Sequence, residues 1–134
     1  MILSHIQLNE NLEEKILHMT PDFPYICCYV EMDKYPGGYI PWHWHDEFEF
    51  GHILGGSMQY KTNHHEFILH EGDGIFVNSG VPHYLHPLEP VEDVRLQSQF
   101  FDRSFLAGAS GSILDIKYIA PVLEQKQLDA VPLY

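Results

Sequence analysis

The sequence predicts an all-β domain in which short antiparallel strands form a sandwich or a barrel. Between residues 23 and 101, the chain divides into short segments rich in aromatic and β-branched residues, the types that favour strands. Glycine, proline and asparagine separate these segments at intervals of roughly 8–12 residues, which is the turn spacing of sandwiches and barrels. The length of 134 residues is that of one compact domain.

The first predicted element is a short helix near the N-terminus. Residues 10–18 read ENLEEKILH, and either Asn9 or Asn11 is suited to cap the first turn of a helix there. The turn-forming sequence from Thr20 to Asp22 is expected to end this helix before the first long strand.

The predicted strands follow from hydrophobic runs bounded by turn residues. Residues 34–41 hold two prolines and two glycines and are therefore expected to form a loop. The turn at residues 62–64 joins two strand-like runs and predicts a β-hairpin. The predicted strands are residues 23–31, 42–54, 57–61, 65–70, 74–78, 81–86 and 93–101.

The pattern changes to helical spacing near the C-terminus. Residues 112–125 place Ile113, Ile116 and Ile119 at intervals typical of a helix, which Pro121 is expected to break or kink. This apolar face has two alternative uses. It can form the symmetric seam of a homodimer, or it can pack on the barrel of its own chain.

The charge of the chain excludes several partners. Lys and Arg number 7 and Asp and Glu number 19, which gives a formal net charge of −12. Nucleic acids and anionic membranes are bound mainly through Lys and Arg, so this chain alone is expected to bind neither. The N-terminus lacks the features of a secretory signal, and no apolar stretch approaches the ~18 residues of a transmembrane helix.

The only cysteines, Cys27 and Cys28, are neighbours in the sequence. Neighbouring cysteines do not easily adopt relaxed disulfide geometry. We therefore expect two reduced thiols in a cytoplasmic protein, with a redox-active pair as the alternative.

Residues 42–50 carry the strongest chemical signal. If they form one strand, His43, His45, Glu47 and Glu49 stand on one face, because successive side chains of a strand point to opposite faces. Imidazole nitrogens and a carboxylate oxygen suit a divalent transition metal such as Zn, Fe, Mn or Ni. The alternative is an amphipathic strand that buries its aromatic residues and leaves the histidines and glutamates in water.

A second segment favours the metal interpretation. His83 ends the sequence NSGVPH, a tight turn that can present one imidazole from a neighbouring strand. Together with His43, His45 and Glu49, it would form a half-open ligand set with positions left for water or a small ligand. The other seven of the ten histidines lack partners that the sequence can identify.

Two motifs resemble those of the cupin superfamily. The first motif matches in full, through Gly37, His43, His45, Glu49 and Gly56. The second matches through Gly72, Asp73, Gly80 and His83. Asn78 stands where many cupins have proline, and Pro87 stands where an asparagine often closes the motif.

The resemblance implies a double-stranded β-helix, which is a small jelly-roll barrel. In metal-bearing cupins the residues that match His43, His45, Glu49 and His83 are the metal ligands. We therefore expect a cupin barrel with a short helix in its N-terminal arm over residues 1–104. A C-terminal helical segment for dimerisation and linkage is expected over residues 105–134.

The chain is most similar to one branch of the superfamily. The segments PWHWHDEFEFGHILGG, GDGIFVNSGVPH and SILDIKYIAPVLE resemble the N-terminal sensor domain of AraC-family transcription regulators. This resemblance implies that a small-molecule effector binds inside the barrel and that the C-terminal helix forms a homodimer. DNA would be contacted by a separate helix-turn-helix domain that this chain does not include, in keeping with its charge of −12.

Three functions are consistent with the sequence. In the favoured one, the domain binds a small polar molecule, for example a sugar, and the bound state biases an attached DNA-binding domain. The alternative is a stand-alone cupin metalloenzyme, a dioxygenase, isomerase or lyase, in which Glu47 binds the ligand or transfers a proton. The third is a dimerisation scaffold without a ligand.

Overall fold

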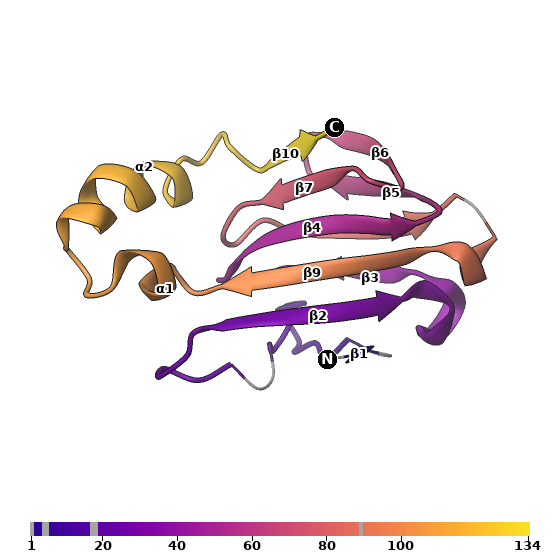
Figure 1. Cartoon of the computed structure of the whole chain (residues 1–134), viewed down its shortest axis with the longest axis horizontal. Coiled ribbons are helices and arrows are strands. Elements are labelled where there is room, and N and C mark those ends of the chain that lie inside the picture. The colour runs from indigo at the N-terminus through magenta and orange to yellow at the C-terminus, as the bar shows by residue number, and fades with distance from the viewer. Residues whose placement is uncertain (1, 4–5, 17–18, 89) are drawn as a thin grey trace.

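The computed structural model describes residues 2–3, 6–16, 19–88 and 90–134, and its two β-sheets pack face to face (Figure 1). The larger sheet has six strands in the order β1-β2-β9-β4-β7-β10, and the smaller has four in the order β3-β8-β5-β6. The strands pair antiparallel, except that β1 runs parallel to β2. Strands far apart in the sequence lie side by side, as in a jelly roll. The predicted all-β cupin barrel is confirmed.

The strand bounds agree with most of the predicted segments. The larger sheet contains β1 (Ile2–Leu3), β2 (Tyr25–Glu31), β9 (Arg95–Phe101), β4 (Phe48–Gly55), β7 (Gly74–Val77) and β10 (Ala130–Leu133). The smaller sheet contains β3 (Ile40–His43), β8 (His83–Pro87), β5 (Ser57–Thr62) and β6 (Glu66–His70). Short 3₁₀ turns lie at Met32–Lys34, Pro36–Gly38 and Val91–Asp93. The predicted hairpin is confirmed as β5 and β6.

The hydrophobic core lies between the two sheets. Burial alternates along β9, so that Leu96, Ser98 and Phe100 face inward from the larger sheet. Met58 and Tyr60 of β5 face inward from the smaller sheet and are fully buried. Each fully buried aliphatic side chain of this kind contributes roughly 1.5–3 kcal/mol to folding, so the core keeps the two sheets together around the polar residues described below.

The predicted N-terminal helix is wrong over residues 10–16, and residues 17–18 lie outside the described part of the chain. The Asn9 side chain accepts hydrogen bonds from the backbone N–H groups two and four residues later, at 2.8 and 3.0 Å. Leu12 has a φ of +64°, which is incompatible with a right-handed helix. Asn9, one of the two predicted capping residues, uses its side chain to close a turn instead of starting a helix.

Instead of forming a helix, residues 11–14 form hydrogen bonds with Trp44. The Glu14 N–H donates to the Trp44 carbonyl at 2.8 Å, and the Trp44 N–H donates to the Leu12 carbonyl at 3.1 Å. The indole N–H of Trp44 also donates to the Asn11 carbonyl at 2.9 Å. These tertiary hydrogen bonds outweigh the helix propensity of an isolated segment.

The predicted strand 42–54 is also wrong as a single strand. Residues 44–47 separate β3 from β4 and carry the chain from the smaller sheet to the larger one. The turn between β7 and β8 packs against this crossing, where the Gly80 N–H donates to the His45 carbonyl at 2.9 Å. The alternation that placed four side chains on one face therefore does not hold across the crossing.

The predicted C-terminal helix is confirmed over residues 113–123. A π-helical turn over Asp115–Ile119 leads into α2 (Ala120–Leu123). The Ala120 N–H donates to the Asp115 carbonyl, five residues back, so the chain is wound more loosely than in an α-helix. This turn comes just before Pro121, which has no N–H to donate. None of the described helices is long and apolar enough to cross a membrane.

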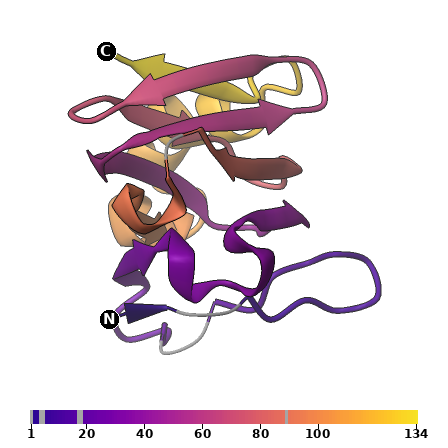
Figure 2. The ribbon, with the colours of Figure 1, turned by 90° about the vertical axis from the view of Figure 1, so that its right-hand side faces the viewer.

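The edge strand β1 and two elements near the C-terminus were not predicted. A short helix, α1 (Arg103–Ala107), follows β9, and β10 pairs antiparallel with β7 at the edge of the larger sheet. Because β1 and β10 are the two edge strands of that sheet, the chain begins and ends on opposite sides of the molecule (Figures 1 and 2). Pro132 is compatible with an edge strand, since no further strand needs its missing N–H.

Two glycines provide a test of the tight turn between β4 and β5. Gly56 and Gly80 both have a φ of +73°, where an ordinary side chain costs roughly 1–2 kcal/mol. A Cβ at Gly56 would lie 2.8 Å from Val94, whereas a Cβ at Gly80 would meet nothing within 4 Å. We expect Gly56→Ala to lower the free energy of urea unfolding more than Gly80→Ala does. Equal losses would show that the steric contact does not matter.

Candidate metal centre

The four predicted ligands come together between the two sheets. His43 of β3 and His83 of β8 are directly opposite each other in the register of the smaller sheet. Glu49 enters from β4 of the larger sheet, and His45 lies on the crossing between β3 and β4. All four side chains are buried, and the ligand atoms of the three histidines lie within 4.8 Å of one another.

Each histidine has its orientation and tautomer fixed by a backbone carbonyl. The Nδ1 atoms of His43, His45 and His83 lie 2.7, 2.8 and 2.8 Å from the carbonyl oxygens of residues two positions away. A carbonyl oxygen only accepts hydrogen bonds, so each Nδ1 carries a proton. In the neutral ring, each Nε2 then has a free lone pair, the form in which histidine binds metals.

The Nε2 atoms of His45 and His83 lie close to the carboxylate of Glu49. His45 Nε2 lies 3.2 Å from Glu49 Oε2, within hydrogen-bond distance. His83 Nε2 lies 3.4 Å from the same oxygen but makes no hydrogen bond in the described structure, although it is fully buried. An unsatisfied buried polar atom costs about 1–3 kcal/mol. A cation among the four groups would satisfy every one of these lone pairs, so the residues fit a metal ion.

The electrostatics of the set also suit a divalent cation. Burial, together with the neighbouring His83, lowers the pKa of His43 well below its usual value, so this ring stays neutral. Burial would raise the pKa of Glu49, but the hydrogen bond with His45 and the electrostatic influence of His45 and His83 lower it well below its usual value. Burial likewise opposes charge on His45, but the Glu49 carboxylate raises its pKa to about 9. The proton that His45 shares with Glu49 occupies the place that a metal ion would take.

Glu14 is a site residue that the sequence did not reveal. Its Oε1 lies 3.7 Å from His43 Nε2, and only 10% of its side chain is exposed. Burial raises the pKa of Glu14 to about 7, partly offset by His45. Together with His43, Glu49 and His83, it lines a cavity of about 20 Å³. No motif spacing could have identified it, because pairing with Trp44 brings it there.

Tyr60 is a second site residue that was missed. Its ring is parallel to that of His83, with the centroids 6.3 Å apart, and it is fully buried. Its hydroxyl has no hydrogen-bond partner among the described residues. Burial and the charge of Glu49 raise the pKa of Tyr60 well above its usual value. The inward alternation of the first hairpin strand was the only sequence signal for it.

Glu47, the predicted ligand-binding residue, is not brought into the cluster. Its side chain lines a separate cavity of about 330 Å³ beside Asp102, and burial raises its pKa. Its backbone carbonyl, however, is the acceptor that orients the ring of His45. A ligand-binding role for the Glu47 side chain stays a prediction.

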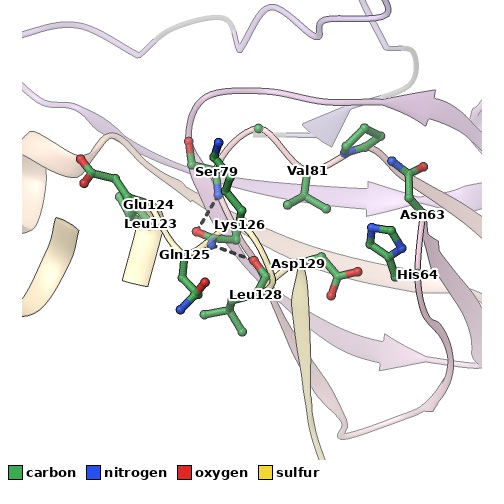
Figure 3. Close-up of a pocket in the computed structure, with 13 residues that line it drawn as sticks. Asn63, His64, Ser79, Val81, Leu123, Glu124, Gln125, Lys126, Leu128 and Asp129 are labelled. Carbon is green, nitrogen blue, oxygen red and sulfur yellow. Dashed lines mark hydrogen bonds between the residues drawn. The ribbon is translucent and has the colours of Figure 1, made fainter. Parts of the chain in front are cut away.

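A larger cavity of about 450 Å³ lies between the hairpin tip, the turn after β7 and the segment after α2 (Figure 3). Asp129 lines it and accepts hydrogen bonds from the Thr62 hydroxyl at 2.5 Å and from His65 Nδ1 at 2.9 Å. His65 lies at the hairpin tip, and 51% of its side chain is exposed. His5 and His18 lie outside the described residues.

Sequence comparisons identify relatives of this chain. Residues 23–132 match the family model described as the AraC-like ligand binding domain. Over 90 residues, the chain is 39% identical to the uncharacterized HTH-type transcriptional regulator YdeC of Bacillus subtilis (strain 168). That match covers 67% of this chain but 30% of the relative, so the chain spans less than a third of its length.

Solved structures that resemble part of this chain include a lyase and an RmlC-like cupin. The DMSP lyase DddQ from Ruegeria pomeroyi is 26% identical, with a TM-score of 0.44 over 48% of this chain and 32% of the lyase. An RmlC-like cupin from Shewanella frigidimarina is 19% identical, with a TM-score of 0.43 over 48% of this chain and 55% of that protein.

Asp129 gives the fold a pH-dependent contribution. Burial would raise its pKa, but hydrogen bonds from Thr62 and His65 hold the pKa below its usual value. A depressed folded-state pKa stabilises the protein above the unfolded pKa of about 4, and this stabilisation is lost as the pH falls further. We expect the difference in unfolding free energy between wild type and Asp129→Asn to shrink from pH 5 to pH 3 in urea titrations. A difference that grows on acidification would contradict this.

Proposed function

The chain belongs to the family of AraC-like ligand binding domains, and from this premise we propose that it senses an effector for a transcription regulator. The observation that carries the proposal is the buried donor set of His43, His45, Glu49 and His83 at the centre of the barrel. We propose that this set holds one divalent ion, with Zn, Fe, Mn and Ni all compatible with three nitrogens and one oxygen. When bound, the ion would act as a Lewis acid that anchors an oxygen atom of the effector.

The size of the interior supports a change of state on effector binding. The cavity beside His43, Glu49 and His83 has a volume of about 20 Å³, which is enough for one ion or one water molecule. A small polar effector, such as a sugar, therefore requires the barrel to open. A ligand that binds the open arrangement better than the closed one shifts the population toward it.

The turn between β7 and β8 connects the centre to the C-terminal segment. On one side, the Gly80 N–H donates to the His45 carbonyl. On the other, the Asn78 side-chain amide donates to the carbonyls of Val122 and Leu128, both at 2.9 Å. A displacement of His45 is therefore passed through one short turn to the end of the C-terminal helix. Asn78, which departs from the usual cupin motif, is the residue that makes this connection.

An exposed helix face supports a homodimer. Ile113 is 76% exposed and Ile116 is 64% exposed, whereas Ile119 is partly buried. The first two side chains therefore do not pack on their own barrel. We propose that they meet the same residues of a second copy, and that DNA is bound by a separate domain in the cytoplasm. The charge of −12 supports this division of roles.

The same donor set supports one alternative, a metalloenzyme. Tyr60 stacks on the ring of His83, and its hydroxyl, which has no hydrogen-bond partner among the described residues, would give such an enzyme a proton donor near the metal. The two functions differ in their response to a ligand, because a sensor binds its effector without changing it. An effector at 100 times its Kd raises the free energy of unfolding by roughly 2.7 kcal/mol. A thermal-shift screen followed by product analysis therefore separates sensor from enzyme, and the absence of any stabilising metabolite would favour a scaffold.

The metal is tested by elemental analysis of the purified chain after loading with Zn²⁺ or Ni²⁺ and dialysis. We expect close to one ion per chain, and we expect His45→Ala to abolish the binding because it removes one of four ligands. His52→Ala is the control, since His52 lies on the same strand as Glu49 but is exposed. Wild-type protein that retains no metal under any loading condition would contradict the proposal.

The dimer is tested by sedimentation of an Ile116→Asp variant. We expect the wild-type chain to sediment as a dimer and the variant as a monomer, because a charge at the centre of an apolar seam is costly to bury. Asp substitution of Ile68, which is 50% exposed on β6, is a matched control that should leave the dimer intact. A variant at position 116 that remains dimeric would place the interface elsewhere.

A further inference from the structure

We propose that Glu14 is a built-in carboxylate ligand of the metal centre, and that a small carboxylate is the class of effector that displaces it. The inference rests on the proposed function, because it assumes that His43, His45, His83 and Glu49 hold a metal ion. It adds a fifth donor from the N-terminal segment, which none of the motifs includes.

The first observation is the position of the Glu14 carboxylate. Glu14 Oε1 lies 3.7 Å from His43 Nε2, which is too long for a hydrogen bond but close enough for both atoms to share one ion. Glu14 also lines the same small cavity as His43, Glu49 and His83. The Glu14 side chain therefore faces the same cavity as three members of the donor set.

The second observation is that the Glu14 carboxyl group is buried without a hydrogen bond among the described residues. Nine-tenths of the side chain is buried, and no hydrogen bond to it is present in the described structure. Glu49, a second carboxylate, lines the same cavity. Glu49 is already hydrogen-bonded to His45, so Glu14 is the acidic group for which a bound cation would supply a partner. A divalent ion would compensate for both acidic groups.

The third observation is that backbone hydrogen bonds hold Glu14 against the segment that carries His43 and His45. The Glu14 N–H and the Trp44 carbonyl are joined at 2.8 Å, and the Trp44 N–H is bonded to Leu12. Trp44 lies between His43 and His45 in the sequence. The register of this pairing sets the carboxylate against the imidazoles, so the contact does not depend on a flexible surface side chain.

The size of the cavity indicates the chemistry of the displacing ligand. A space of about 20 Å³ admits one ion but no polyatomic effector as long as Glu14 is in place. A ligand that reaches the metal must replace the carboxylate, and another carboxylate replaces it with the same charge and the same donor atoms. A small carboxylate is therefore the effector class that this site selects.

Cobalt(II) spectroscopy of the 134-residue chain tests the inference, because the visible absorption of Co²⁺ reports its ligand number. The variants are Glu14→Gln and Glu14→Ala, with Glu13→Gln as the control, since the Glu13 side chain bonds to Asn9 near the surface. We expect both Glu14 variants to bind Co²⁺ about 10–100-fold more weakly and with a changed spectrum. Acetate should restore the wild-type spectrum in Glu14→Ala at concentrations that leave the Glu13→Gln spectrum unchanged.

Thermal unfolding separates loss of a ligand from loss of the fold. In EDTA, Glu14→Gln should be at least as stable as wild type, because an uncompensated buried carboxylate has been removed; with Co²⁺ it should gain less stability than wild type. If wild type binds Co²⁺ and the Glu14 variants match it in affinity and spectrum, the inference is wrong while the metal centre stands. If neither wild type nor Glu13→Gln binds Co²⁺, the proposed metal function fails as well.

Discussion

The structure depends on one electrostatic constraint, the convergence of three imidazole rings and a carboxylate in the buried space between the two sheets. Three backbone carbonyls hold the Nδ1 protons of His43, His45 and His83 and so turn every Nε2 inward. Without a cation, the set has to share a proton between His45 and Glu49 and leaves His83 Nε2 unsatisfied. A divalent ion would compensate for this arrangement, and this links the geometry to the proposed sensing function.

The rest of the fold positions this centre and connects it to the surface. The aliphatic core joins the two sheets on which the ligands stand, and the crossing between β3 and β4 delivers His45. The turn after β7 contacts that crossing through Gly80 and contacts the C-terminal segment through Asn78. The N-terminal segment covers the centre with Glu14. The N-terminal segment therefore contacts the centre directly, and the C-terminal segment is connected to it through the turn after β7.

The sequence predicted the fold and the residues that come together between the sheets, because short strands, turn residues and motif spacing are local signals. It predicted them partly by a wrong argument, since His43 and Glu49 belong to different strands and meet through tertiary packing. Glu14, the missing N-terminal helix and the pairing of β10 with β7 depend on contacts between distant segments, which local propensity does not encode. Glu47 was predicted to lie beside the candidate ligands because residues 42–54 were expected to form one unbroken strand. In the structure Glu47 lies between β3 and β4, so the alternation does not place it there.

The most direct test of a cation at the centre of the barrel is anomalous X-ray diffraction from crystals of the chain loaded with Zn²⁺ or Ni²⁺, measured at the absorption edge of the metal. We predict a single strong peak about 2 Å from the Nε2 atoms of His43, His45 and His83 and from a carboxylate oxygen of Glu49. An empty centre in metal-saturated crystals, or a peak held only by exposed histidines, would contradict the account.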